Sequence, residues 1–242
     1  DESIKKFPNC IEAYPNLANV LVIKGRIDTA KKILIKAIEL NPNYLKSYGN
    51  LAGIYVGEGD FGEAELLLRK SIEKNPNDIN TLVNLACVLK DLGKIKEAEK
   101  FLRNALEINP TYEKVLTNLG AVLNELEKTD EGERYLRKAL NINPASLMAL
   151  NNLGNILSKK KNYNEAELCY RKAIDIKSDF SLAYNNLATL LTRIGKLSEA
   201  EEFTEKAILY NPKFELAYVN LGSIKIDLDK LTEAEELFLR AI

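Results

Sequence analysis

Seven asparagines recur along the chain at a spacing of 34 residues, and their side chains carry the most regular recognition chemistry in the sequence. A carboxamide offers an acceptor oxygen and N–H donors, so it matches a peptide unit without consulting that unit's side chain. A row of such groups suits hydrogen bonding to a polypeptide backbone. The column consists of Asn16, Asn50, Asn84, Asn118, Asn152, Asn186 and Asn220.

The residue types that carry catalysis or hold metal ions are scarce. The chain has no His, which is the commonest general base and metal ligand. Cys10, Cys87 and Cys169 lie far apart and form no CxxC pair, which argues against a zinc site or a disulfide scaffold. We therefore expect a non-catalytic segment with no cofactor and no metal, and reduced thiols typical of the cytoplasm.

The charge balance restricts the class of partner. The sequence has 34 basic and 35 acidic residues, for a formal net charge of -1. Nucleic-acid binding depends on clustered Lys and Arg, and membrane-surface binding on polybasic segments, and neither pattern is present. No apolar run approaches the roughly 18 residues that span a bilayer. We expect a protein or peptide partner, with no nucleic acid and no membrane.

The elements that position the asparagines are set by a repeat. Prolines recur every 34 residues, with Ser178 interrupting the series, at Pro8, Pro42, Pro76, Pro110, Pro144 and Pro212. A leucine follows each asparagine of the column, from Leu17 to Leu221. A period of this size indicates a solenoid of supersecondary units.

Each repeat predicts two helices. The spacing of Tyr48, Leu51, Ala52 and Tyr55 is one face of a first helix, which we call helix A. A second apolar stripe, including Ala98 and Leu102 in one repeat, predicts helix B. Gly25, Gly59, Gly93 and Gly195 suit left-handed helix ends in the A–B turns. Asn-Pro pairs should end helix B, because proline lacks the N–H donor.

These columns resemble the signature of the tetratricopeptide-repeat (TPR) family over essentially the whole chain. The resemblance implies an all-α fold, a right-handed α-α superhelical solenoid of TPR helix pairs, whose A helices line the concave surface. It also implies a scaffold for protein–protein interaction. We expect a helix-B tail at 1–10 and seven repeats, the last truncated, within a longer parent chain. The repeats are 11–44, 45–78, 79–112, 113–146, 147–180, 181–214 and 215–242.

The asparagine column should lie at the inner edge of the A helices, beside the buried leucines. It is similar to the inner surface of the TPR superhelix of O-linked N-acetylglucosamine transferase, whose asparagine ladder holds extended polypeptide. Neighbouring A helices should lie about 10 Å apart, and an extended chain advances about 3.3 Å per residue. One asparagine would then meet about every third peptide residue. The alternative is that the asparagines serve helix packing or solubility.

Other columns refine the predicted groove. Small residues at Asn19, Gly53, Cys87, Ala121, Asn155, Thr189 and Ser223 would leave room for a ligand backbone. A polar, mildly cationic cluster is expected in the fifth and sixth repeats, from Asn151, Asn152, Asn155, Lys159, Asn185, Asn186 and Arg193. Apolar pockets are expected from Met148, Leu182, Leu216 and Val219.

Two further positions carry structural expectations. Lys225 occupies a column that is otherwise apolar or aromatic, which indicates a solvent-facing end. The glutamates that recur early in helix B should form a solvated outer face. They are Glu65, Glu99, Glu133, Glu167, Glu201 and Glu235.

Two other functions stay open. The chain would serve as a substrate-recruitment arm if the parent protein were a larger enzyme, such as a glycosyltransferase. It would serve as a self-association module, giving a homo-oligomer, if its exposed terminal repeats bound another copy.

Overall fold

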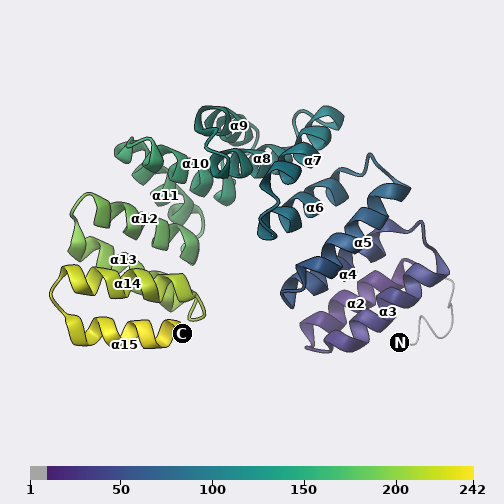
Figure 1. The fold of residues 1–242 in the computed structure, drawn as a ribbon, viewed down its shortest axis with the longest axis horizontal. Coiled ribbons are helices and arrows are strands. Elements are labelled where there is room, and N and C mark those ends of the chain that lie inside the picture. The colour runs from purple at the N-terminus through teal and green to yellow at the C-terminus, as the bar shows by residue number, and fades with distance from the viewer. Residues whose placement is uncertain (1–9) are drawn as a thin grey trace. The chain divides into compact units, whose positions relative to one another are not determined.

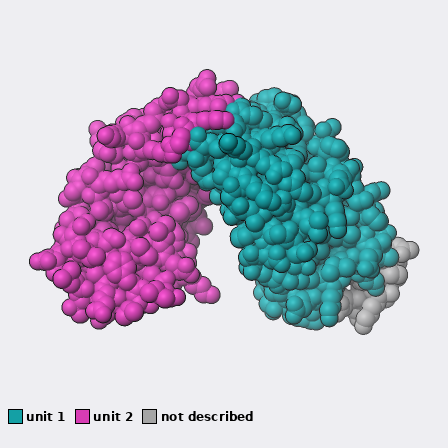
Figure 2. Space-filling view, in the orientation of Figure 1, with its two compact units in different colours: residues 1–126 teal, residues 127–242 magenta. Residues whose placement is uncertain are grey.

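The computed structural model describes residues 10–242, which form fourteen α-helices. The chain divides into two compact units, Asp1–Leu126 and Glu127–Ile242 (Figure 2). The expected helix-B tail at 1–10 lies outside the described residues except for Cys10.

Unit 1 alternates four A helices with three B helices. Each A helix packs against the B helix that follows it where the unit contains one, and neighbouring A helices also pack together (Figure 1). The A helices are α2 (Ala13–Ile23), α4 (Leu45–Gly57), α6 (Ile79–Asp91) and α8 (Glu113–Glu125). The B helices are α3 (Ile27–Leu40), α5 (Phe61–Lys74) and α7 (Ile95–Ile108).

Unit 2 repeats this arrangement and begins with a B helix. Helix α9 packs against α10, and three A–B pairs follow in chain order (Figure 1). The A helices are α10 (Leu147–Lys159), α12 (Ser181–Arg193) and α14 (Glu215–Asp227). The B helices are α9 (Thr129–Ile142), α11 (Tyr163–Ile176), α13 (Leu197–Tyr210) and α15 (Leu231–Ala241).

The turn between helices A and B needs a left-handed residue at one position in every repeat. Four repeats supply glycine, as predicted, with φ between 71° and 80° at Gly25, Gly59, Gly93 and Gly195. The other three place a side chain there, with φ of 60° at Glu127, 62° at Lys161 and 63° at Asp229. The geometry is therefore a property of the repeat, and three repeats adopt it at a steric cost.

The Asn-Pro pairs end helix B as predicted. The asparagine at each of these ends has extended or near-extended backbone, as at Asn75 with φ −143°. Its side-chain oxygen then accepts the N–H two residues later, for example Asn77 at 3.2 Å. Pro15 is tolerated in α2 because it lies in the first turn of the helix.

The core of each unit is a line of leucine and alanine side chains between the helices. In unit 1, Ala18 and Leu21 of α2 pack with Leu34 of α3 and Leu51 of α4. The predicted stripes thus face inward, and the all-α fold of TPR helix pairs is confirmed.

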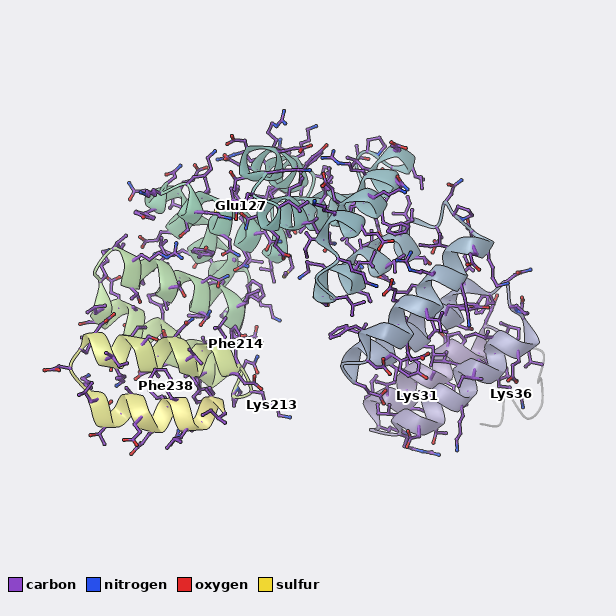
Figure 3. All side chains as sticks on the ribbon, in the orientation of Figure 1. Lys31, Lys36, Glu127, Lys213, Phe214 and Phe238 are labelled. Carbon is purple, nitrogen blue, oxygen red and sulfur yellow. The ribbon has the colours of Figure 1, made fainter. Side chains whose placement is uncertain are left out.

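Two glycines of helix A make room for aromatic rings of helix B. A Cβ at Gly154 would lie 2.5 Å from the Tyr170 ring, and one at Gly222 would lie 2.8 Å from the Phe238 ring. Figure 3 labels Phe238, which comes from α15. A small residue on helix A is therefore paired with a large one on helix B within the same repeat.

The prediction of a solvated outer glutamate face was wrong for most of its members. The side chains of Glu65, Glu99, Glu133 and Glu167 are only 12% to 22% exposed. Each bonds to an arginine four residues later, namely Arg69, Arg103, Arg137 and Arg171. Three of these arginines also reach a glutamate of the next repeat, at Glu97, Glu165 and Glu199. These glutamates lie on the B helices, and their arginine partners hold the partly buried carboxylates in this ladder. Glu235 is exposed as expected.

The prediction that Lys225 faces solvent was also wrong. Lys225 is only 7% exposed, and its Nζ lies 2.5 Å from the Glu201 carboxylate and also bonds to Glu233. These two glutamates occupy the columns of Glu65 and Glu97, which Arg69 bridges in unit 1. Position 205, where an arginine would complete the ladder, is an exposed glutamate. Lys225 thus supplies, from helix A, the cation that helix B lacks.

Candidate functional site

The seven column asparagines all lie on A helices, next to the partly or fully buried leucines. Asn16 is exposed, and the other six are half-buried. Unit 1 carries the asparagines of α2, α4, α6 and α8, and unit 2 those of α10, α12 and α14. Each side chain therefore has one side against the protein and one side at the surface.

In unit 1, the column asparagines of α4 and α8 use their amide nitrogens within the protein. Asn50 Nδ2 donates to Asn19 Oδ1 at 3.0 Å and to the Pro15 carbonyl at 3.4 Å, which joins α4 to α2. Asn118 Nδ2 donates to the Lys114 carbonyl at 2.8 Å. These asparagines thus contribute to packing, which is the alternative that the sequence left open.

In unit 2, the same donor joins neighbouring A helices. Asn186 Nδ2 donates to Asn151 Oδ1 at 2.9 Å, and Asn220 Nδ2 donates to Asn185 Oδ1 at 2.8 Å. Asn151 and Asn185 are each 1% exposed. They were expected in the groove-facing polar cluster, and that expectation was wrong, because they lie one position nearer the core than the column asparagines.

Asn84 and Asn152 differ from their neighbours in the column. Neither side chain makes a hydrogen bond to any other residue between positions 10 and 242. Both are half-buried on their A helices. They keep a donor and an acceptor available to a ligand, and their substitution would break no hydrogen bond within residues 10–242.

Two of the other predicted site residues of unit 2 form polar contacts within the protein. The Tyr170 hydroxyl donates to Asn155 Oδ1 at 2.7 Å, so this oxygen is tied to helix B. Lys159 lies 2.7 Å from the Glu127 carboxylate, which offsets its charge. Arg193 is exposed at the end of α12 and has no ion pair within the described part of the chain. Arg193 is thus the least engaged of the predicted cations.

Cavities lie on the A-helix face of the described part of unit 1. The first, about 660 Å³, lies between α2 and α4 and is mainly apolar, with walls from Val22, Ile23 and Ile54. The second is about 210 Å³ and the third about 300 Å³, and both lie between α4 and α6. Asn50 lines the first and third, and Asn84 lines the second and third. Two column asparagines therefore border hollows on this face.

Glycines on α4 open these cavities. Gly49 and Gly53 line the first two, and a Cβ added at either would meet nothing within 4 Å. Gly57 lies one turn further and is equally open. The absence of side chains leaves bare helix backbone between the hollows, as the small-residue column at Gly53 predicted. Sequence reasoning missed the apolar wall, although Ile23 is the only apolar residue in a column that is otherwise charged or glycine.

The apolar residues predicted to form pockets in unit 2 lie at the surface. Met148, Leu216 and Val219 are 47%, 53% and 39% exposed, and Leu182 is half-buried. Three of them occupy one column at the N-terminal ends of α10, α12 and α14. Unit 2 thus presents an exposed apolar row beside its asparagines.

Two of the three thiols, those of Cys87 and Cys169, lack the environment of a nucleophile. Cys87 lies on α6, where burial raises its pKa, and its Sγ is 3.5 Å from Asn118 Oδ1. Burial raises the pKa of Cys169 to about 11. Both thiols are therefore protonated near neutral pH, the form that is a poor nucleophile. Between residues 10 and 242, no three His, Cys, Asp or Glu side chains converge to hold a metal ion.

No helix between Ala13 and Ala241 is both long enough and apolar enough to cross a lipid bilayer.

Family models identify the repeat. Five models, each described as a tetratricopeptide repeat, match residues 21–86, 79–112, 112–179, 169–202 and 216–242. This chain is a tetratricopeptide-repeat protein. TPR modules have protein partners and are typically non-catalytic, and these models describe no catalytic domain.

Solved structures agree with the TPR fold. A tetratricopeptide repeat protein from Parabacteroides merdae ATCC 43184 is similar at 23% identity and a TM-score of 0.78, over 96% of this chain and 91% of that one. PilF of Pseudomonas aeruginosa is similar at 20% identity and a TM-score of 0.70, over 90% and 97%. YrrB, a TPR protein with an unusual peptide-binding site, is similar at 25% identity and a TM-score of 0.56, over 75% and 94%.

No curated protein sequence gives a significant match to this TPR protein. The similarity to known proteins is to the TPR repeat, and it does not extend to the asparagine ladder of the glycosyltransferase.

Proposed function

We propose that this TPR protein is a scaffold that binds extended polypeptide of a partner protein along its A helices through the column asparagines. The observation that carries the proposal is the unpartnered side chain of Asn84 beside the hollows of unit 1, together with the equally unpartnered side chain of Asn152 in unit 2. These two amides have no partner within residues 10–242, and Asn84 borders two cavities. An unpaired, half-buried carboxamide beside open space suits a ligand that brings its own donors and acceptors.

The chemistry of the A-helix face supports a peptide more than a small molecule. An extended chain needs hydrogen-bonding partners for its backbone and space for its side chains. In unit 1 the asparagines alternate with cavities along α2, α4 and α6. In unit 2 they alternate with a row of apolar side chains, namely the exposed Met148 and Leu216 and the half-buried Leu182. YrrB, at 25% identity, is itself described as having a peptide-binding site, which adds support.

Retention of a random extended-peptide library tests the proposal. Wild-type protein would be compared with an Asn84→Ala/Asn152→Ala variant, whose changes break no internal hydrogen bond. The matched control is Asn104→Ala/Asn164→Ala, which removes two exposed amides from the B helices α7 and α11. We expect wild type and control to retain the same peptides, and the ladder variant to retain at least tenfold less, since two hydrogen bonds are lost.

Each outcome has a defined meaning, provided that circular dichroism gives equal helicity for the three proteins. Equal retention by all three would reject the asparagine column as the peptide site. Loss in the B-helix control alone would move the binding surface to the outer helices.

A further inference from the structure

The hydrogen-bond polarity of the column asparagines is fixed by their neighbours in unit 1. The nitrogen of Asn50 contacts the Pro15 carbonyl, and that of Asn118 contacts the Lys114 carbonyl. A backbone carbonyl only accepts, so these contacts determine which terminal atom of each amide is the N–H donor. The donor thus points to the protein.

Buried asparagines fix the same polarity in unit 2. Asn151 and Asn185 present their oxygens to the nitrogens of Asn186 and Asn220. Turning either column amide over would set oxygen against oxygen and leave an acceptor of a 1% exposed residue unsatisfied. An unsatisfied buried acceptor costs about 1–3 kcal/mol. The inward orientation of the nitrogen is therefore favoured while the buried amide keeps its own orientation. At Asn220 it is also set by Thr189 Oγ1, which donates to the Asn185 carbonyl and so accepts from Asn220 Nδ2.

The oxygens on the same amides are left for a ligand. The two terminal atoms of a carboxamide diverge, so a nitrogen held against the neighbouring helix turns the oxygen away from it. Within residues 10–242, Oδ1 of Asn50, Asn186 and Asn220 accepts no hydrogen bond. Asn220 Nδ2 also lies 3.4 Å from Thr189 Oγ1, which engages this donor group further.

We propose that these three oxygens, one in unit 1 and two in unit 2, act as acceptors that bind backbone N–H groups of the polypeptide; we call them the acceptor rows. The inference rests on the proposed function and specifies its chemistry. Asn50, Asn186 and Asn220 contact the ligand as acceptors only. Asn151 and Asn185 do not touch it; they are positioning residues that hold the amides of the next repeat with oxygen outward.

The proposal defines the ligand. Proline has no backbone N–H, so it is excluded at the residues that meet the acceptor row. Those residues should lie about three apart, since neighbouring A helices lie roughly 10 Å apart and an extended chain advances about 3.3 Å per residue. Unit 2 should disfavour a ligand with a cationic side chain. The positive charge of Arg193, which lies without an ion pair on the same helix as Asn186, would repel it.

Backbone ester scanning tests the acceptor rows. Peptides retained from the random library would be remade with one amide N–H at a time replaced by an ester oxygen, which removes the donor without adding bulk. We expect the affinity of wild-type protein to fall about threefold to tenfold at positions about three residues apart, and to change little between them. Uniform tolerance of the esters, in peptides whose retention requires Asn84 and Asn152, would overturn the acceptor rows and leave the proposed function standing.

An Asn151→Leu variant tests the positioning role. Leucine has a similar size but no acceptor, so the amide of Asn186 is freed to turn over. We expect one ester-sensitive position to become tolerant, a change that a general loss of stability would not produce. Unchanged ester sensitivity in this variant, or in Asn185→Leu if the first fails to fold, would reject the positioning role. If no peptide is retained through the asparagines, both the function and the acceptor rows are rejected.

Discussion

Replacing Lys225 tests whether the ion-pair ladder between repeats is completed from helix A in the last repeat. The perturbation is Lys225→Met, which keeps most of the side-chain stem and removes the cation. Glu201, 19% exposed, would lose its closest partner but keep Lys230 at 3.2 Å, while Glu233, 54% exposed, would turn to water. Breaking a fully buried pair costs about 3–5 kcal/mol. Because Glu201 keeps Lys230 and Glu233 is solvated, we expect the free energy of unfolding to fall by less, about 2 kcal/mol.

The compensating change makes the test specific. Adding Glu205→Arg places an arginine four residues after Glu201, as Arg69 follows Glu65. The double variant should recover at least half of the lost stability, whereas Glu205→Arg alone should gain little, because Lys225 already occupies the site. Repeat proteins unfold regionally, so native-state hydrogen exchange of α13, α14 and α15 is the appropriate assay.

The pH dependence follows from the same carboxylate. The hydrogen bond from Lys225 lowers the pKa of Glu201. A carboxyl with a depressed pKa in the folded state contributes stability above its unfolded pKa, and that stability is lost as the pH falls through the folded value. Wild type should therefore lose more stability than Lys225→Met on acidification below the ordinary carboxyl range. Equal stability of wild type and Lys225→Met, or no recovery in the double variant, would refute the reasoning.

Three further predictions concern single positions. Gly53→Leu should raise the free energy of unfolding by about 0.5–1 kcal/mol, because glycine is a poor helix former, and urea titration measures this effect. The same change should abolish peptide retention in unit 1, because the leucine side chain fills the open face of α4. Undiminished retention of library peptides would show that the cavity is not part of the binding site. Lys161→Gly should stabilise by about 1 kcal/mol, because Lys161 has φ 62°, and Gly195→Lys should destabilise by a similar amount, with equal midpoints in urea contradicting both. Glu65→Gln should reduce the loss of stability in acid, since Lys94 lowers the pKa of Glu65; unchanged acid sensitivity would show that this pair contributes nothing.

The fold was predictable because local signals coincide with the repeat. Pro42 and Pro76 mark helix ends, Leu51 and Leu85 mark the buried stripe, and Gly59 marks the turn. The left-handed backbone of Glu127 could not be predicted from the residue type. Its position, in the column that holds glycine in other repeats, was a usable signal.

The polar contacts were less predictable, because periodicity gives the face of a helix and not the partner across the gap. Lys225 was expected to face water, since a lysine in an apolar column conflicts with burial unless a carboxylate reaches it. The glutamate at position 205, where other repeats have arginine, was the available clue. Asn151 and Asn186 were grouped together by sequence, yet Asn151 is buried and its Oδ1 accepts a hydrogen bond from Asn186 Nδ2. The buried position and the column position are one residue apart, which is about 100° around the helix, and grouping them together ignored that difference in direction.

The most direct test of the peptide-binding account is to observe the asparagine side chains while peptide binds. Side-chain amide resonances of the protein would be recorded by NMR with and without a peptide retained from the library. The account predicts shifts for Asn50, Asn84, Asn152, Asn186 and Asn220 on the A helices, and none for Asn104 and Asn164 on the B helices. Saturable binding that shifts Asn104 or Asn164 and leaves the A-helix amides unmoved would contradict it.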